Sequence, residues 1–512
     1  MPGCDRISEL PESLLTHILS YLPTKHSVKT SVLSTRWKNL WLNVPALDLH
    51  CEDFPYREEE EEAVLGFLDR LLEFEPGSRL LKVTVECGSV EDIEGLRDRI
   101  STVIHRGPQH LDFESFTEYR DHDDAFIDYI PLNLYTSRTL VSLKLTFSGL
   151  EDPGFVWMPC LKSMTLVKVH FHYAADLEKL VSGCPVLEEL TLVRNMDPIL
   201  VGTDEKIMRV RSGSLKRFRV PFWHGKRCRS SVKCTLEIDA PMLEHMTIGE
   251  DHYDSVMVKN LTSLFMVDLG IKFAVKFGEF VDPGDLSKRN EIRYFLSGVS
   301  SAKHMIISEK TVKALELYSN VGLIPKFNYL SRLEAVFPYK LLQFLPAFLE
   351  CCPNLKHLIL EVYYSREMED AFELTNVPGC FLSTLQCVQL RRIHEWEEEE
   401  MKVATYFLEN AAVLKKLTLS LTNYPRYVSD EEIFEEFFWG YYLLKGRRPR
   451  DYMATMTGMS LGMLLARFTA RNPLAILFSV LSLTVIHMYG MLQVGVSIGA
   501  GAAQPGPNPP ST

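Results

Sequence analysis

The feature of this sequence that most constrains its fold is an apolar pattern, L-x-x-L-x-L, that returns through the middle of the chain. The pattern, with Met, Ile, Phe or Val at some positions, begins at Leu140, Leu161, Leu187, Leu215, Leu243, Leu261, Val312 and Leu355. Side chains of a strand alternate between two faces, so each copy predicts a short strand that buries one face. A single copy cannot bury that face by itself, and the pattern therefore predicts a stack of similar units.

The spacing of the copies indicates the class of stack. Successive starts at 140, 161, 187, 215 and 243 are 21, 26, 28 and 28 residues apart, which is typical of leucine-rich repeats. The phrase C-P-x-L at 184–187 and 352–355 would mark the turn that enters a strand. The alternative is an ordinary mixed α/β domain with unrelated strands. A stack would offer an extended surface to macromolecules, but the sequence does not indicate which polar positions touch a target.

The first 41 residues carry a different pattern, with two short amphipathic helices and two tryptophans. Pro11 suits the first turn of a helix, after which apolar residues recur on one face at Leu14, Leu15, Ile18, Leu19 and Leu22. Pro23 would end this helix, and Thr24 would cap a second helix. The apolar stripe then continues at Trp37, Leu40 and Trp41. Such a short segment cannot bury this surface alone, so it needs the rest of the chain or a partner.

The order of residues in this segment resembles the F-box. Residues 10–23 match L-P-x-x-[LI]-[LI]-x-x-I-[LF]-S-[YF]-L-P, and residues 32–41 match the plant-type V-L-S-x-R-W-x-x-L-W. The resemblance implies docking on a Skp-type adaptor and, through it, on the cullin of a ubiquitin ligase. The implied adaptor contacts are Leu10, Pro11, Leu14, Leu15, Ile18, Leu19, Leu22, Val32, Leu33, Ser34, Arg36, Trp37, Leu40 and Trp41. His26 departs from the acidic residue usual in relatives, which we expect to affect only the rim.

A further resemblance lies at 381–421, which reads as a strand, an acidic run, an amphipathic helix and another strand. The inner face of this helix would consist of Val403, Phe407, Leu408 and Ala411. The runs 406–411 and 413–417 resemble the FBD region that follows leucine-rich repeats in a plant F-box family. The F-box, the repeats and this segment together place most of the chain inside one family pattern.

The C-terminal tail departs from that pattern. From Asn472 to the end no formally charged side chain occurs, and 474–492 would form a helix about 28 Å long, close to the ~30 Å hydrocarbon core of a bilayer. A helix of this length could span a bilayer, and Arg467 and Arg471 before it would then leave the F-box in the cytosol. The alternatives are a helix that packs on the repeats and an acquired tail without function.

Composition excludes several classes of function. The net charge of −12 argues against a general nucleic-acid binder, because phosphate affinity requires clustered Lys and Arg. The 11 cysteines are odd in number, and the N-terminal sequence MPGCDRISEL lacks the apolar core of a signal peptide. We therefore expect a reducing intracellular compartment. The G-x-S-x-G phrase at 495–499 has no acid or histidine after Ser497. We therefore assign no catalytic residue, no metal site and no cofactor.

The expected fold is α/β: a short helical F-box, an irregular leucine-rich-repeat solenoid, an FBD-like α/β segment and an apolar helical tail. The expected regions are 1–45 for the F-box, 46–110 for a connecting segment and the first irregular repeats, 111–375 for the leucine-rich repeats, 376–421 for the FBD-like segment, 422–450 for a linker and 451–512 for the tail.

The expected function is that of a non-catalytic substrate-recognition subunit of a Skp, cullin and F-box type E3 ubiquitin ligase. Its partners would be the Skp-type adaptor, cullin through that adaptor, and a protein target bound by the repeats, with no nucleic acid. The alternative is a leucine-rich-repeat scaffold without ligase activity, anchored to a membrane by its tail. The expected location is cytoplasmic or nuclear, and the alternative is an intracellular membrane with the F-box in the cytosol.

Overall fold

The fold is taken from a computed structural model of the chain. It describes residues 7, 9–50, 53, 60–73, 80–87, 93–115, 130–171, 173–194, 205–221, 233–249, 253, 255–271, 273, 286–363, 374–393 and 398–421. The chain divides into two compact units: Met1–Arg391 with Val403–Leu414, and Arg392–Lys402 with Lys415–Thr512.

The N-terminal segment forms two short helices and two 3₁₀ turns around a small core. These elements are α1 (Glu12–Leu19), α2 (Thr24–Lys29), η1 (Thr30–Val32) and η2 (Leu40–Asn43). The core side chains are Leu15, Leu19, Trp37, Leu40 and Val44. The predicted helices are therefore present, and the segment buries part of its apolar stripe within itself.

Two details of the predicted helix ends were wrong. α1 ends at Leu19, with Ser20 in the capping position, so it stops before Pro23. Thr24 is the first residue of α2 and not its cap. Its hydroxyl instead accepts a hydrogen bond from the backbone N–H of Asp48, at 2.8 Å, because the chain returns to this helix as it enters the first strand.

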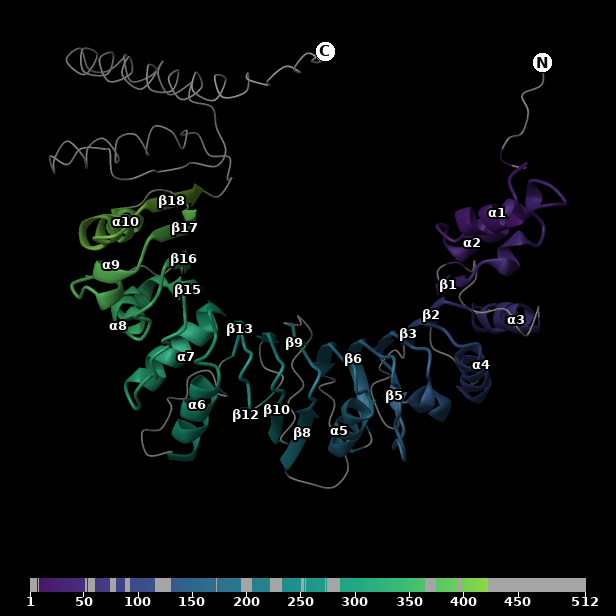
Figure 1. Cartoon of the computed structure of the whole chain (residues 1–512), viewed down its shortest axis with the longest axis horizontal. Helices are drawn as coiled ribbons and strands as arrows, with labels where there is room; N and C mark the ends of the chain where they lie inside the picture. The colour runs from purple at the N-terminus through teal and green to yellow at the C-terminus, as the bar shows by residue number, and fades with distance from the viewer. Residues whose placement is uncertain are drawn as a thin grey trace, which may run out of the picture. The chain divides into compact units, whose positions relative to one another are not determined.

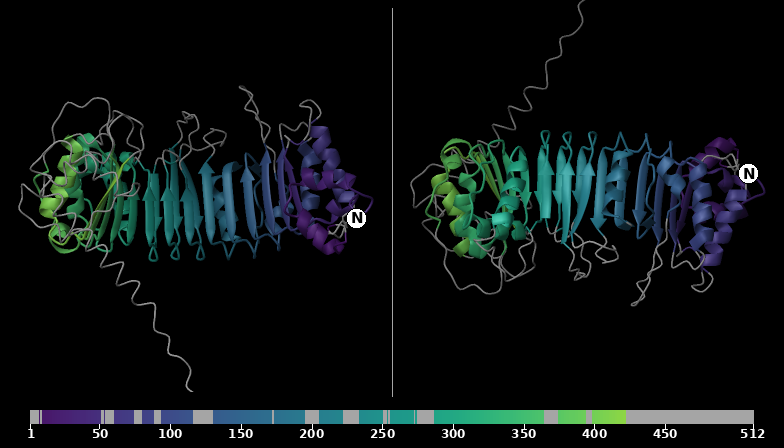
Figure 2. Two further views of the ribbon diagram at one scale, coloured as in Figure 1. Left: turned by 90° about the horizontal axis from the view of Figure 1, so that it is seen from above. Right: turned by 90° about the horizontal axis from the view of Figure 1, so that it is seen from below.

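A long parallel sheet forms the body of the first unit (Figures 1 and 2). Each strand pairs in parallel with its neighbour. In order, the strands are β1 (Ala46–His50), β2 (Lys82–Cys87), β3 (His110–Ser115), β4 (Ser142–Thr146), β6 (Ser163–Phe171), β7 (Glu189–Arg194), β9 (Arg217–Val220), β11 (His245–Ile248), β13 (Met266–Leu269), β14 (His304–Ile307), β15 (Arg332–Pro338), β16 (His357–Tyr363) and β17 (Cys387–Ile393).

Helices and shorter strands make up the rest of the described chain, and several helices lie along one side of this sheet (Figure 1). The helical elements are α3 (Glu60–Glu73), α4 (Ile93–His105), η4 (Leu132–Thr136), α5 (Ala174–Ser182), α6 (Leu286–Gly298), α7 (Glu309–Ser319), η5 (Tyr339–Phe344), α8 (Leu345–Glu350), α9 (Gly379–Ser383) and α10 (Glu398–Asn410). The remaining strands are β5 (Gly149–Leu150), which pairs with β6, β18 (Lys416–Leu421), and a separate parallel sheet of β8 (Glu205–Arg211), β10 (Lys233–Asp239) and β12 (Ser255–Lys259).

Most predicted copies of the apolar pattern form strands with the expected side chains buried. In β7, for example, Leu190 and Leu192 are buried, and Leu187 is buried in the turn before the strand. The copies that begin at Leu140, Leu161, Leu215, Leu243 and Leu355 behave in the same way. The prediction of a repeating stack is thus confirmed for these six copies.

Two predicted copies were wrong in position. The copy placed at Leu261 begins instead at Leu264, because β13 pairs Val267 with Met246 of β11 and buries Val267 and Leu269. The copy placed at Val312 lies in helix α7, where Val312 and Leu315 are buried. An L-x-x-L spacing also fits one face of a helix, and Ser308 begins this helix by accepting a hydrogen bond from the N–H of Thr311, at 3.3 Å.

The predicted helix of the FBD-like segment is α10, and its expected inner face is buried. Within the first unit, the ring of Phe407 lies 5.3 Å from the ring of Phe381, measured between centroids.

No helix among the described residues is both long and apolar enough to cross a membrane. The predicted span 474–492 lies outside the described residues, so the membrane anchor stays a prediction.

The close approach of two loops at Gly183 gives a test of the packing between repeats. A β-carbon on Gly183 would lie 2.4 Å from Val156 Cγ1, and the Gly183 carbonyl accepts the N–H of Met158, at 2.9 Å. Gly183→Ala should therefore lower the free energy of unfolding by about 1–3 kcal/mol, measured by urea denaturation. Gly66→Ala in α3 is the matched control, because nothing lies within 4 Å of the added carbon. Equal stability of Gly183→Ala and the wild type would contradict the packing.

Candidate functional surfaces

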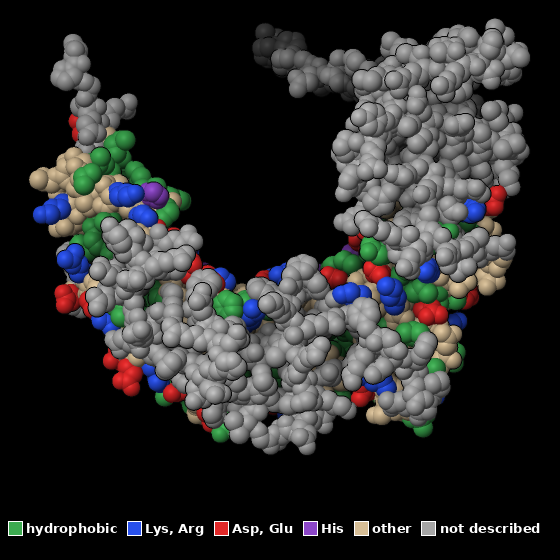
Figure 3. Space-filling view, turned by 180° about the vertical axis from the view of Figure 1, so that it is seen from behind, with side chains coloured by type: hydrophobic (Ala, Val, Ile, Leu, Met, Phe, Trp, Pro, Cys, Tyr) green, Lys and Arg blue, Asp and Glu red, His purple; other side chains and the backbone are tan. Residues whose placement is uncertain are grey.

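The apolar residues of the N-terminal segment divide into an inward and an outward set. Leu15 and Leu19 of α1 are buried, with 0% and 1% of their surface exposed, whereas Leu14 is 48% and Ile18 44% exposed. Further outward residues are Leu22, Val32 and Leu33, at 41%, 88% and 64% exposed. We call Leu14, Ile18, Leu22, Val32 and Leu33 the exposed apolar surface. Hydrophobic side chains are visible at this end of the chain beside Lys, Arg and His (Figure 3).

The other predicted adaptor contacts lie partly inside the segment. Leu15, Leu19, Trp37 and Leu40 form its core, and Leu10 packs against that core. Pro11, Ser34 and Arg36 are exposed, and the Arg36 guanidinium donates a hydrogen bond to the carbonyl of Leu10. The structure thus brings the predicted residues together, but it gives the four core residues the role of holding the outward residues in place.

The N-terminal helices are joined closely to the repeats. The ring of Trp41 stacks on Phe67 of α3, with centroids 5.5 Å apart. Lys25 of α2 pairs with Asp53, which follows β1, at 3.2 Å. Together with the hydrogen bond from Asp48 to Thr24, these contacts attach the exposed apolar surface to the start of the sheet.

The second candidate surface is the face of the long sheet that the apolar core does not use. Along most strands of the long sheet the buried residues alternate with half-buried or exposed, mostly polar ones, so the polar residues of neighbouring strands stand in rows. One row, which we call the open-face row, runs through Asp112, Lys144, Thr165, Thr191, Arg219, Thr247 and Asp268. We assigned no target-binding residue from the sequence. These positions are the residues between the last two apolar positions of each copy, so the strand register alone would have found them.

Several charges on this face are paired with one another. Lys144 Nζ lies 3.0 Å from Asp112 Oδ2, and Arg217 pairs with Glu189. Farther along, Glu334 accepts hydrogen bonds from Arg332 at 2.9 Å and from Arg391 at 3.2 Å. Burial raises the pKa of the Asp268 carboxyl, and the nearby Glu334 raises it further.

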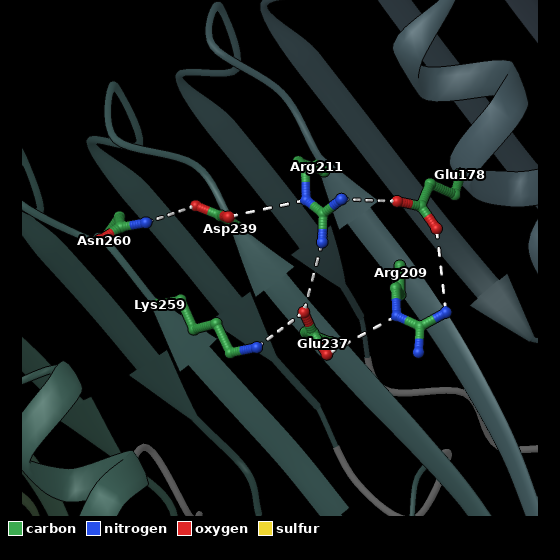
Figure 4. Close-up of polar contacts among 7 residues, drawn as sticks. All are labelled: Glu178, Arg209, Arg211, Glu237, Asp239, Lys259 and Asn260. Carbon is green, nitrogen blue, oxygen red and sulfur yellow. Dashed lines mark hydrogen bonds and ion pairs between the residues drawn. The ribbon is translucent and has the colours of Figure 1, made fainter.

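The separate sheet carries a network of charges that satisfy one another (Figure 4). Glu237 of β10 is 7% exposed and accepts a hydrogen bond from Lys259, at 2.9 Å. Arg209 and Arg211 of β8 also approach Glu237, each at 3.7 Å, and both pair with Glu178 of α5. Because the three cations face three carboxylates, Asp239 included, this network is better suited to holding the sheet and α5 together than to attracting a charged partner.

The described part of the chain contains no group of three or more His, Cys, Asp or Glu side chains arranged to hold a metal ion. The described cysteines carry free thiols, and burial raises the pKa of the Cys184 and Cys380 thiols to about 12. A thiol in such a setting is a poor nucleophile.

The fold and these two surfaces define a leucine-rich-repeat protein with a helical interaction module at its N-terminus. Family comparisons agree: the F-box domain matches residues 7–47, the LRR repeats of an FBD-associated F-box protein match 99–265, and FBD matches 373–419. Two Arabidopsis thaliana relatives, named FBD-associated F-box protein At5g27750 and F-box/FBD/LRR-repeat protein At1g13780, are each 59% identical over 442 residues. The alignments cover 85% of this chain and 96% and 95% of the relatives.

The chain belongs to the plant F-box/FBD/LRR-repeat family. The segment resemblances found in the sequence are thereby confirmed. A more distant relative, named putative F-box/FBD/LRR-repeat protein At5g44950, is 45% identical over 436 residues, which cover 84% of this chain and 96% of the relative.

A histidine where the F-box meets the sheet gives a pH-dependent test. The hydrogen bond between His50 Nδ1 and Glu86 Oε2, at 2.6 Å, raises the pKa of His50 above its ordinary 6.5, and Asp48 raises it further against the opposing effect of burial. A raised pKa means that protonated His50 stabilises the folded chain. This stabilisation is complete below 6.5 and is lost as the pH rises through the raised pKa.

His50→Gln should therefore lower the melting temperature more at about pH 6 than at about pH 8. His26→Gln is a suitable control, because His26 is exposed and forms no ion pair with another described residue. If the loss of melting temperature in His50→Gln stays constant or grows as the pH rises, protonated His50 does not stabilise the folded chain.

Proposed function

We propose that this chain is the substrate-recognition subunit of a Skp, cullin and F-box type E3 ubiquitin ligase. The observation that carries the proposal is the exposed apolar surface of the F-box. Five large aliphatic side chains lie open between Leu14 and Leu33, on elements already ordered by the core beneath them. Apolar groups gathered in this way favour a protein partner, and a few anchors of this kind supply most of the binding energy of an interface.

The mechanism of such a subunit needs no catalytic side chain of its own. The F-box would bind the Skp-type adaptor, and through it cullin, while the leucine-rich repeats bind a protein target. The target's lysines would then be held near the ubiquitin-charged enzyme, so that the rate increases through proximity and orientation. The contacts of Trp41 with Phe67 and of Thr24 with Asp48 support this role, because they attach the adaptor-binding module to the repeats. We propose a cytoplasmic or nuclear location for this assembly.

Substitutions in the exposed apolar surface allow the effect on adaptor binding to be measured separately from the effect on folding. Leu14→Asp combined with Ile18→Asp should keep the F-box folded, with only a small loss of melting temperature, because nearly half of each side chain already faces solvent. The double variant should bind a purified Skp-type adaptor at least about 30-fold more weakly, a loss of ~2 kcal/mol or more. Biolayer interferometry with the full chain measures this change.

Two further variants control the experiment. Leu323→Asp places the same charge on a leucine that is 90% exposed and lies between α7 and β15, and it should bind the adaptor like the wild type. Trp37→Ala removes a side chain that is 6% exposed, and it should lower the stability by about 3–5 kcal/mol and lose binding as the F-box unfolds. Normal binding by the folded double variant, or no binding by the folded wild type, would contradict the proposal and favour the scaffold alternative.

A further inference from the structure

The open-face row contains a stretch of hydrogen-bond donors without a carboxylate. Between Asp112 of β3 and Asp268 of β13 it reads Lys144, Thr165, Thr191, Arg219 and Thr247, one residue from each of β4, β6, β7, β9 and β11. We call these five residues the donor row. Two of them are cations and three are hydroxyls, which favour an acceptor-rich partner.

The centre of the donor row is available to a partner. Arg219 is exposed and forms no ion pair with another described residue. The residues paired with it in register are Thr191 on one side and Thr247 on the other. The hydroxyls of these threonines form no hydrogen bond with another described residue. The charge network of the separate sheet differs in this respect, because its cations are already neutralised there.

The His245 side chain beside the donor row has a ring nitrogen without a hydrogen-bond partner among the described residues. His245 is paired in register with Arg217, two residues before Arg219 on the same face. The Nδ1 atom of His245 is buried and has no hydrogen-bond partner among the described residues. A buried polar atom without a partner is costly, so it is a place where a bound molecule or water is expected to contribute.

The geometry of the row indicates the length of its occupant. Neighbouring strands lie about 4.8 Å apart, so the four steps from Lys144 to Thr247 cover roughly 19 Å. An extended chain covers about 3.3–3.6 Å per residue, so roughly six residues would span the row. Lys144 and Arg217 are already paired with Asp112 and Glu189, which leaves the single positive charge of Arg219 to be matched by a carboxylate.

We propose that the donor row binds an extended segment of the target protein that carries an Asp or Glu, with that carboxylate on Arg219 and backbone or side-chain oxygens on Thr191 and Thr247. The proposal names the substrate class of the repeats and therefore rests on the proposed function. The partner is a protein segment, because a nucleic acid needs several unpaired cations for its phosphates, and Lys144, the other cation of the donor row, is already paired with Asp112.

The test is direct binding of a peptide to the full chain by fluorescence anisotropy, in the absence of the adaptor. The probe is a labelled peptide of alternating Asp and Gly, compared with one of alternating Asn and Gly and one of alternating phosphoserine and Gly. The wild type should bind the Asp peptide in preference to the Asn peptide, and added salt should weaken this binding. Arg219→Gln should bind it at least about fivefold more weakly, Arg219→Glu more weakly still, and Arg219→Lys should keep most of the affinity.

Control variants separate the donor row from general charge. Arg293→Gln removes an exposed arginine on α6, outside the sheet, and should bind like the wild type. Thr191→Val removes one hydroxyl with little change of shape, and should weaken binding about two- to fivefold. All variants should keep the wild-type melting temperature and adaptor affinity, so a failure of adaptor binding by the wild type would bear on the proposed function alone.

Equal binding of the Asp and Asn peptides by the wild type would overturn the proposal, as would unchanged affinity of Arg219→Gln. Binding of the phosphoserine peptide without binding of the Asp peptide would also overturn it, because the site would then require a doubly charged group.

Discussion

The structure depends on the burial of alternate apolar side chains along one continuous parallel sheet. No strand can cover its own apolar face, so every repeat requires the register of its neighbour, as Met246 shows where it pairs with Val267 on one side and Phe218 on the other. The same register places the intervening polar residues on the opposite face. The constraint that builds the core therefore also builds the surface that we propose for target binding.

The F-box follows a different rule, because it is too short to bury all of its apolar residues. α1 uses Leu15 and Leu19 for its own core and leaves Leu14 and Ile18 exposed. The contact between Trp41 and Phe67 then attaches this small core to the helices that cover the sheet. A segment organised in this way is ordered before it meets a partner, which lowers the entropy that binding must overcome.

Much of this organisation could be predicted from the sequence, because it rests on spacing. Six copies of the apolar pattern, the helices of the F-box and the inner face of α10 were recognisable by period alone. The first irregular repeats were expected within 46–110, but β1 to β3 and β14 were not placed individually. Val, Phe, Met and Ile replace leucine in several of these strands, as in Val83, Phe113 and Met305. The shift at Leu264 and the helix at Val312 could not be resolved, since L-x-x-L fits two registers and a helix equally well. The sequence pattern also does not show which residues of α1 face outward, because that depends on how the helix packs on the rest of the F-box.

The most direct test of the central claim is amide hydrogen exchange of the full chain with and without a purified Skp-type adaptor. The account predicts slower exchange on adaptor binding in residues 12–22 and 28–36, where the exposed apolar surface lies. It predicts no change in β9 and β11, which carry Arg219 and Thr247 of the donor row. Slower exchange confined to the repeats, or no change in the F-box at saturating adaptor, would contradict it.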